Sequence, residues 1–294
     1  MARVDHARAE ALVIPSVRFH KPASQLRDLV TSYYVVDAPG PVSDHLHPEW
    51  GNVRFNLAGR WEVEQFTTRP GPPPSDAALF GPTDRSRSIN TDGGTMMGVG
   101  LTPLGWVTLI GDDASEAANR VVELDGHLGT PGREIAARLR ASPDDAARVA
   151  LLDRVLGAHA AGQGPRCPLT VRIDRALLGA APRDVAGFAD AAAVDGKQLA
   201  RGCQRAFGFT PKRLIRRQRF LRTLAAMREH PDRPLSESID PDYYDQAHFI
   251  HDFHQYMGMS PRAYFSSPRE LIRRAAAERT RILDAPLQGL HRSA

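Results

Sequence analysis

Two stretches of the chain follow one pattern 50 residues apart: residues 195–211 read DGKQLARGCQRAFGFTP and residues 245–261 read DQAHFIHDFHQYMGMSP. Each begins with an aspartate, a preferred helix N-cap, and each reaches a glycine, a common residue just past a helix end. A proline follows each glycine by three residues, where it favours the first turn of another helix. The pattern therefore predicts two helix–turn units of the same design.

The helix predicted in each unit has a buried stripe and a polar face. Apolar residues at i, i+4 and i+7 form the stripes, which are Leu199, Cys203 and Ala206 in the first helix and Phe249, Phe253 and Tyr256 in the second. The first polar face is cationic, whereas the second contains histidines and has no Lys or Arg. Lys and Arg pair with guanine edges or phosphates, and Gln pairs with adenine.

The charge distribution favours a polyanionic partner. Residues 1–170 hold 17 Lys/Arg against 20 Asp/Glu, whereas residues 196–230 hold ten Lys/Arg and a single acid, Glu229. Nucleic acid and an anionic membrane surface both fit this charge, and a solvated helix face is the simpler alternative. A helix over residues 211–230 would span about 30 Å, close to the ~34 Å of one DNA turn, so it could place two recognition helices in successive grooves.

The same residues resemble the signature of AraC/XylS-type transcription regulators. The second unit carries the resemblance with residues 245–249 (DQAHF), Phe253 and residues 258–264 (GMSPRAY), and the first with Leu199, Arg201, Gly208, Pro211 and Leu214. The resemblance implies an all-helical DNA-binding domain over residues 169–270, with two helix-turn-helix units joined by the 211–230 helix. It implies base or DNA contacts by Lys197, Ala200 and Arg201 and by Gln246, Ala247, His248 and His251. Four further polar residues of the recognition helices belong to the expected DNA-binding set: Gln198, Gln204, Arg205 and His254. Phosphate contacts are expected from Lys212, Arg213 and Arg216.

The chain departs from the family pattern in both units. Gly202 and Cys203 stand where a large apolar residue and an aromatic one are usual, and a glycine inside a helix costs about 1 kcal/mol. Pro241 disfavours helix just before itself, in the segment expected to support the second recognition helix. His251 stands where Arg is common. We therefore expect the second unit to bind DNA less tightly or less specifically than the first.

The N-terminal part reads as strands followed by helices. Residues 33–36 (YYVV) and 53–57 (VRFNL) are β-type runs, and helical periodicity begins near Ile135. Residues 47–51, 55–57, 80–82 and 99–103 resemble the sensor domain of some family members. The expected fold class is thus multi-domain α+β. Its parts are a β-rich sensor or dimerisation domain with C-terminal helices at 1–160, for which a cupin-like sheet is one alternative, a linker at 161–168, the DNA-binding domain at 169–270 and a partly helical tail at 271–294.

Candidate ligand sites in the N-terminal part are weaker. His45, His47 and Glu49 resemble a fragment of a cupin metal motif, but the spacing is short and no third histidine ligand is evident, so turn residues are the favoured reading. No P-loop or Gly-x-Ser-x-Gly sequence occurs, and two cysteines give no disulfide framework. We expect no metal and no cofactor. An effector pocket could be lined by His47, Trp50, Trp61 and Trp106, with core packing as the alternative for each tryptophan.

These observations predict a sequence-specific transcription regulator rather than an enzyme. Its expected partners are a double-stranded DNA operator, a small-molecule effector, a second copy in a homodimer and, for an activator, RNA polymerase. No apolar run is long enough to cross a membrane and no signal peptide is evident, so a cytoplasmic location is expected. One alternative is an enzyme or a metal- or ligand-binding protein acting through the N-terminal domain. Another is an interaction module that uses its basic helix on acidic partners.

Overall fold

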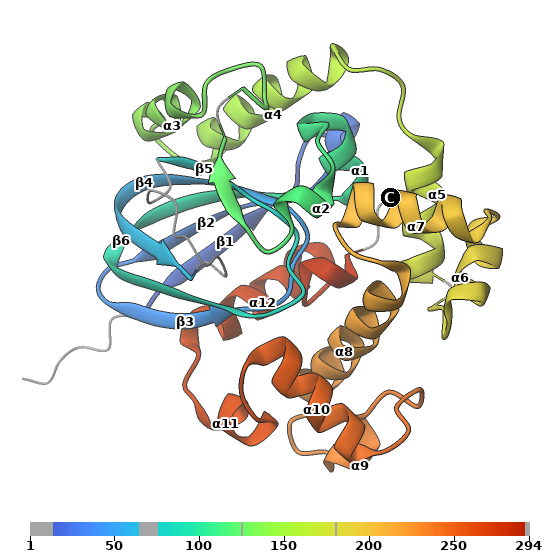
Figure 1. Cartoon of the computed structure of the whole chain (residues 1–294). Helices are drawn as coiled ribbons and strands as arrows, with labels where there is room; N and C mark the ends of the chain where they lie inside the picture. Colours follow the sequence, from blue (N-terminus) through green and yellow to red (C-terminus); the bar gives the residue numbers. More distant parts are fainter. Residues whose placement is uncertain (1–13, 65–75, 125, 180, 292–294) are drawn as a thin grey trace, which may run out of the picture.

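A computed structural model describes residues 14–64, 76–124, 126–179 and 181–291 (Figure 1). Residues 1–13 and 292–294, which the predicted segments 1–160 and 271–294 include, lie outside the described residues. The N-terminal part is an antiparallel sheet with the strand order β1-β2-β6-β4-β5-β7, and β3 also pairs with β6. Its strands are β1 (Ser16–His20), β2 (Val30–Ala38), β3 (Val42–Leu46), β4 (Asn52–Val63), β5 (Ala77–Phe80), β6 (Arg87–Leu101) and β7 (Val121–Glu123).

The sheet buries both of its faces, because successive side chains of a strand point to opposite sides. In β2, Tyr33 and Val35 belong to the core under the N-terminal helices, whereas Tyr34 and Val36 pack on the opposite face. The first face is covered by helical segments that follow or interrupt the strands. These segments are η1 (Ser24–Leu26), α1 (Pro103–Gly105), η2 (Trp106–Ile110), α2 (Ala114–Ala117), α3 (Gly132–Ala141) and α4 (Asp145–Ala161).

The rest of the described chain is helical. The helices are α5 (Pro168–Gly179), α6 (Val185–Ala192), α7 (Gly196–Phe207), α8 (Pro211–Glu229), α9 (Leu235–Ser238), α10 (Gln246–Met257), α11 (Pro261–Ser266), α12 (Glu270–Leu283) and η3 (Gln288–Leu290). An antiparallel sheet with helices, followed by a helical region, confirms the predicted α+β fold class. None of the helices in the described ranges is long and apolar enough to cross a membrane.

The last helix does not extend the helical region as a separate tail. Instead, α12 returns to the N-terminal sheet and covers its second face, where it packs against β1 and β3 (Figure 1). Leu271 joins a buried cluster with Val17, Phe19 and Val36 of the sheet. Leu271 lies more than 230 positions away from these three sheet residues in sequence. Local periodicity could therefore predict the helix but not the sheet face that it covers. The helical region therefore packs on the sheet through its last helix.

Candidate nucleic-acid interface

The recognition helix of the first unit is α7, and local capping fixes its two ends. The Asp195 carboxylate accepts a hydrogen bond from the backbone N–H of Gln198 at 2.7 Å, and the Gln198 side chain accepts one from the Asp195 N–H at 3.4 Å. This reciprocal pair is a capping box. Gly208 ends the helix with φ at +80°, a conformation that glycine adopts without strain. Thr210 occupies the next N-cap position, although its side chain makes no cap hydrogen bond.

The solvent-facing side of α7 is exposed and cationic. Lys197, Arg201, Gln204 and Arg205 are all exposed, while Leu199, Cys203 and Ala206 are buried. Within the described residues, no ion pair involves Lys197, Arg201 or Arg205. Cations that are already exposed and unpaired can bind phosphates or base edges without first breaking an internal contact.

Close packing explains why Gly202 departs from the family pattern. A Cβ added at this position would lie 2.4 Å from Cδ1 of Ile173, on α5. Glycine therefore lets α5 approach α7 closely, which explains its presence inside a recognition helix. The neighbouring Cys203 is buried, and burial raises the pKa of its thiol to about 12, so it packs in the core as a neutral thiol.

The second unit repeats the caps of the first. Asp245 accepts from the backbone N–H of His248 at 2.7 Å, Gly258 ends α10 with φ at +70°, and Ser260 caps α11. The supporting helix α9 covers only Leu235–Ser238, in agreement with the restriction that Pro241 places on the residues before it. Gln246, Ala247, His251 and His254 form an exposed face on α10.

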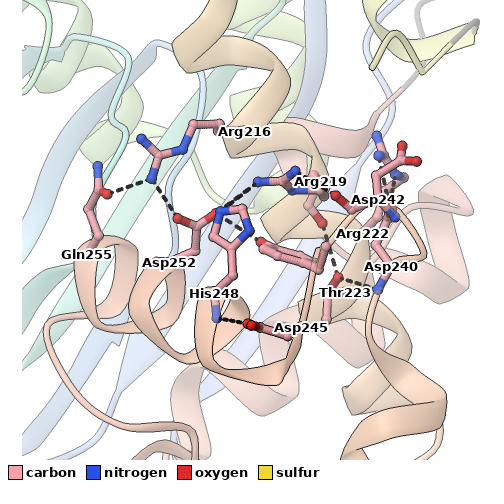
Figure 2. A network of polar contacts seen from close by, with 11 residues as sticks. Arg216, Arg219, Arg222, Thr223, Asp240, Asp242, Asp245, His248, Asp252 and Gln255 are labelled. Carbon is pink, nitrogen blue, oxygen red and sulfur yellow. Dashed lines mark hydrogen bonds and ion pairs between the residues drawn. The ribbon is translucent and has the colours of Figure 1, made fainter. Parts of the chain in front are cut away.

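Buried Asp252 joins α10 to α8 (Figure 2). It is fully buried, and it accepts hydrogen bonds from Arg216 at 2.6 Å, from Arg219 at 3.4 Å and from the Tyr243 hydroxyl at 3.2 Å. Arg219 also donates to the backbone carbonyl of Asp242 and stacks over the Tyr243 ring. The charged hydrogen bonds from the two arginines compensate for the burial of this carboxylate, and they fix the orientation of α10 on α8.

The predicted phosphate contacts on α8 are therefore not equivalent. Lys212 is exposed and has no ion pair among the described residues. Arg216 is committed to Asp252 and Gln255, and Arg213 is paired with Asp84 of the N-terminal domain. His248 is half-buried, with its ring edge-on to Tyr243, so it is less accessible than its neighbours on α10.

The N-terminal domain docks on the end of α7 and on α8. Trp50 lies in the core of the first unit, 5.4 Å from the Phe207 ring. The guanidinium of Arg217 stacks 3.9 Å from the Trp50 ring and donates to the Thr83 carbonyl. Burial lowers the pKa of Arg217 to about 10, so the group still carries its charge at neutral pH. Sequence reasoning missed this interface, since nothing local to Trp50 or Arg217 indicates the partner.

The four residues expected in an effector pocket do not meet in one place. Trp106 is buried under the first sheet face and donates to the Asp112 carbonyl, Trp50 lies in the domain interface, and Trp61 packs on the second face of the sheet. His47 alone of the four lines a cavity of about 110 Å³ between the second sheet face and α12. Its Nε2 shares a 2.6 Å hydrogen bond with the Tyr264 hydroxyl. No cluster of three or more potential metal-ligating side chains occurs in the part of the chain that the structure describes.

Comparisons with known proteins agree with the helical geometry. Residues 188–267, which include both recognition helices, match a family model described as a helix-turn-helix domain. No curated protein matches the chain. One solved structure, described as the crystal structure of the AraC-like transcriptional activator CuxR, aligns with 72% of this chain and 87% of that chain at 16% identity, but its TM-score of 0.30 carries no argument about fold.

The two capped units and the family match define the class of this part of the chain: residues 188–267 form a helix-turn-helix domain, the kind of domain found in DNA-binding regulators of transcription. This match spans residues 199–214 and 245–264, and it supports the resemblance to AraC/XylS-type regulators that these residues carry.

Proposed function

We propose that the protein is a sequence-specific regulator that reads its operator mainly through α7, with α10 as a second and weaker reader. The carrying observation is the exposed cationic face of α7, whose Lys197, Arg201 and Arg205 form no ion pair with any residue that the structure describes. The exposed face of α10 has no Lys or Arg, so its electrostatic attraction to phosphate is smaller. The 19 residues of α8 span about 28 Å, a separation compatible with adjacent major grooves on one side of the DNA.

We further propose that the N-terminal domain controls DNA binding through a small-molecule effector. Two structural features support this. The sheet domain contains a cavity, and it holds Arg213, an expected phosphate contact, in an ion pair with Asp84. An effector that changes the docking of the two domains would change the availability of Arg213 to DNA.

Selection of bound sequences from random DNA tests the first proposal, followed by gel shifts with the selected site over a salt series. Arg201→Ala should cost about 1–3 kcal/mol on the selected site and relax the preference at one base pair. Arg233→Ala is the matched control, since Arg233 is exposed but lies outside both recognition helices.

The outcomes separate base-specific recognition from electrostatic attraction to the phosphates. If Arg201→Ala weakens binding to all sequences equally, Arg201 contacts phosphate only. If the wild type selects no sequence and shows only a steep salt dependence, the proposal of specific reading is wrong. Selected sites with two copies of one half-site would support the homodimer, and a single site covering two adjacent grooves would support a monomeric reader.

A further inference from the structure

The cavity between the second sheet face and α12 has an apolar wall that two separate parts of the chain provide. Phe19, Val36 and Met96 come from the strands, and Leu271 and Ala275 come from α12. At about 110 Å³ the cavity is smaller than the ~150 Å³ apolar cavity that can hold benzene. A ligand of this space must have a small apolar body.

One charged side chain in the cavity wall has no carboxylate partner within the described ranges. Arg279 of α12 is only 6% exposed, and its Nη1 donates to Ser32 Oγ at 3.2 Å. Its Nε and Nη2 atoms are buried and have no hydrogen-bond partner among the described residues. Burial lowers the pKa of Arg279 to about 10, and the guanidinium therefore stays protonated at neutral pH. Buried charges are ordinarily paired, so this group lacks an anion.

The nearest acid of the wall is already occupied. Glu49 pairs with Arg54, which also donates to the Tyr34 hydroxyl at 2.8 Å, and Nη1 of Arg54 is again buried without a partner in the described chain. The wall thus presents two guanidinium groups and one carboxylate. His47, the remaining titratable base of the wall, is kept neutral because burial holds its pKa well below its usual value. One negative charge is needed to balance the cavity.

We propose that this cavity binds a small monocarboxylate with a short apolar body, whose carboxylate pairs with Arg279. A guanidinium presents its N–H groups as a planar fork that matches a carboxylate, and the apolar wall accommodates the rest of the molecule. The proposal rests on the proposed function of the N-terminal domain as an effector sensor, and it names the chemical class of the effector.

The cavity wall also contacts the DNA-binding domain, so a ligand bound in the cavity can affect how that domain is held. The segment after α12 packs on α8, where Gln218 donates to the Gly289 carbonyl at 2.8 Å. Gln288, one residue earlier, lines the cavity and bonds to Asn52 of β4 at 3.0 Å. A ligand whose carboxylate pairs with Arg279 stabilises the contact of α12 with the sheet. It thereby stabilises the docked arrangement of the two domains.

Calorimetric titration and thermal unfolding of the full chain test the proposal with butyrate and propionate as probes. Their uncharged amides, butyramide and propionamide, are the ligand controls. We expect both acids to bind and raise the unfolding temperature, with the amides at least tenfold weaker. Arg279→Met should weaken acid binding at least tenfold, whereas Arg281→Met, on the exposed side of the same helix, should not change it.

The unliganded stability of Arg279→Met separates a binding role from a structural one. Replacing an unpaired buried cation by an apolar side chain should leave the unfolding temperature equal or higher. A large loss of stability would show that an internal partner holds Arg279, and the proposal would be wrong. Equal binding of acids and amides, or no binding of either acid at 10 mM, would also overturn it. Gel shifts on the same preparations distinguish these failures from a failure of the DNA-binding proposal, because specific DNA binding would persist.

Discussion

The two recognition helices end at equivalent glycines, and this repetition provides a matched pair of substitutions. Gly208 and Gly258 both have a positive φ, at +80° and +70°. Alanine at either position should pay about 1–2 kcal/mol for the left-handed backbone. A Cβ at Gly258 would meet no described atom within 4 Å, whereas a Cβ at Gly208 would lie 2.7 Å from Pro82 Cγ and 3.0 Å from the Ala114 carbonyl oxygen.

The difference between the two substitutions therefore measures the docking of the N-terminal domain. Overpacking of a close contact costs about 1–3 kcal/mol, so Gly208→Ala should lower the free energy of unfolding by that much more than Gly258→Ala does. Urea unfolding of the full chain followed by tryptophan fluorescence is suited to the measurement. Trp50, which packs on the Phe207 ring, reports on this interface.

Limited proteolysis provides the second readout. Weakened docking should speed cleavage in the segment 161–168 for Gly208→Ala but not for Gly258→Ala. Equal free energies of unfolding and equal cleavage rates in the two variants would refute the reasoning, because they would mean that Pro82 and Ala114 do not contact the end of α7 in solution.

Two further predictions concern buried groups. Asp252→Asn should lower the free energy of unfolding by about 3 kcal/mol, because it weakens charged hydrogen bonds from two arginines, one of which is a third exposed. Chemical unfolding measures this loss, with the exposed Asp232→Asn as the control. Equal stabilities of the two variants would contradict the prediction. Stability should also fall as the pH drops below about 6.5, because burial keeps the folded-state pKa of His47 well below that value and lowers that of His291 to about 4, so the unfolded chain binds more protons. The slope should be at most about 1.4 kcal/mol per pH unit for each histidine. Replacing His47 by Gln should reduce the slope, and an unchanged profile would show that it contributes nothing.

Local chemistry explains why the helix ends were predictable. The aspartate caps, the two left-handed glycines and the prolines at positions 211 and 261 act within one turn of the chain, so their spacing in sequence is their spacing in space. The polar face of α7 was predictable for the same reason, since its buried stripe follows the helical period.

Charge alone did not reveal which cations are free. Arg213 and Arg216 have the same sequence signal as Lys212, yet one pairs with Asp84 and the other with Asp252. The two acids lie far from these arginines in sequence. The docking of the N-terminal domain brings Asp84 to Arg213, and the packing of α10 on α8 brings Asp252 to Arg216. That Arg279 is buried without a carboxylate partner among the described residues could not be predicted for the same reason.

The return of α12 to the N-terminal sheet has a consequence for how the protein is made. A growing chain emerges from its N-terminus, so the seven strands leave the ribosome well before the helix that covers them. Until residues 270–283 follow, Val17, Phe19, Val36 and Met96 face water as an apolar surface. The sheet can therefore complete its core only after the DNA-binding domain has been synthesised, and chaperones would have their greatest effect in this interval.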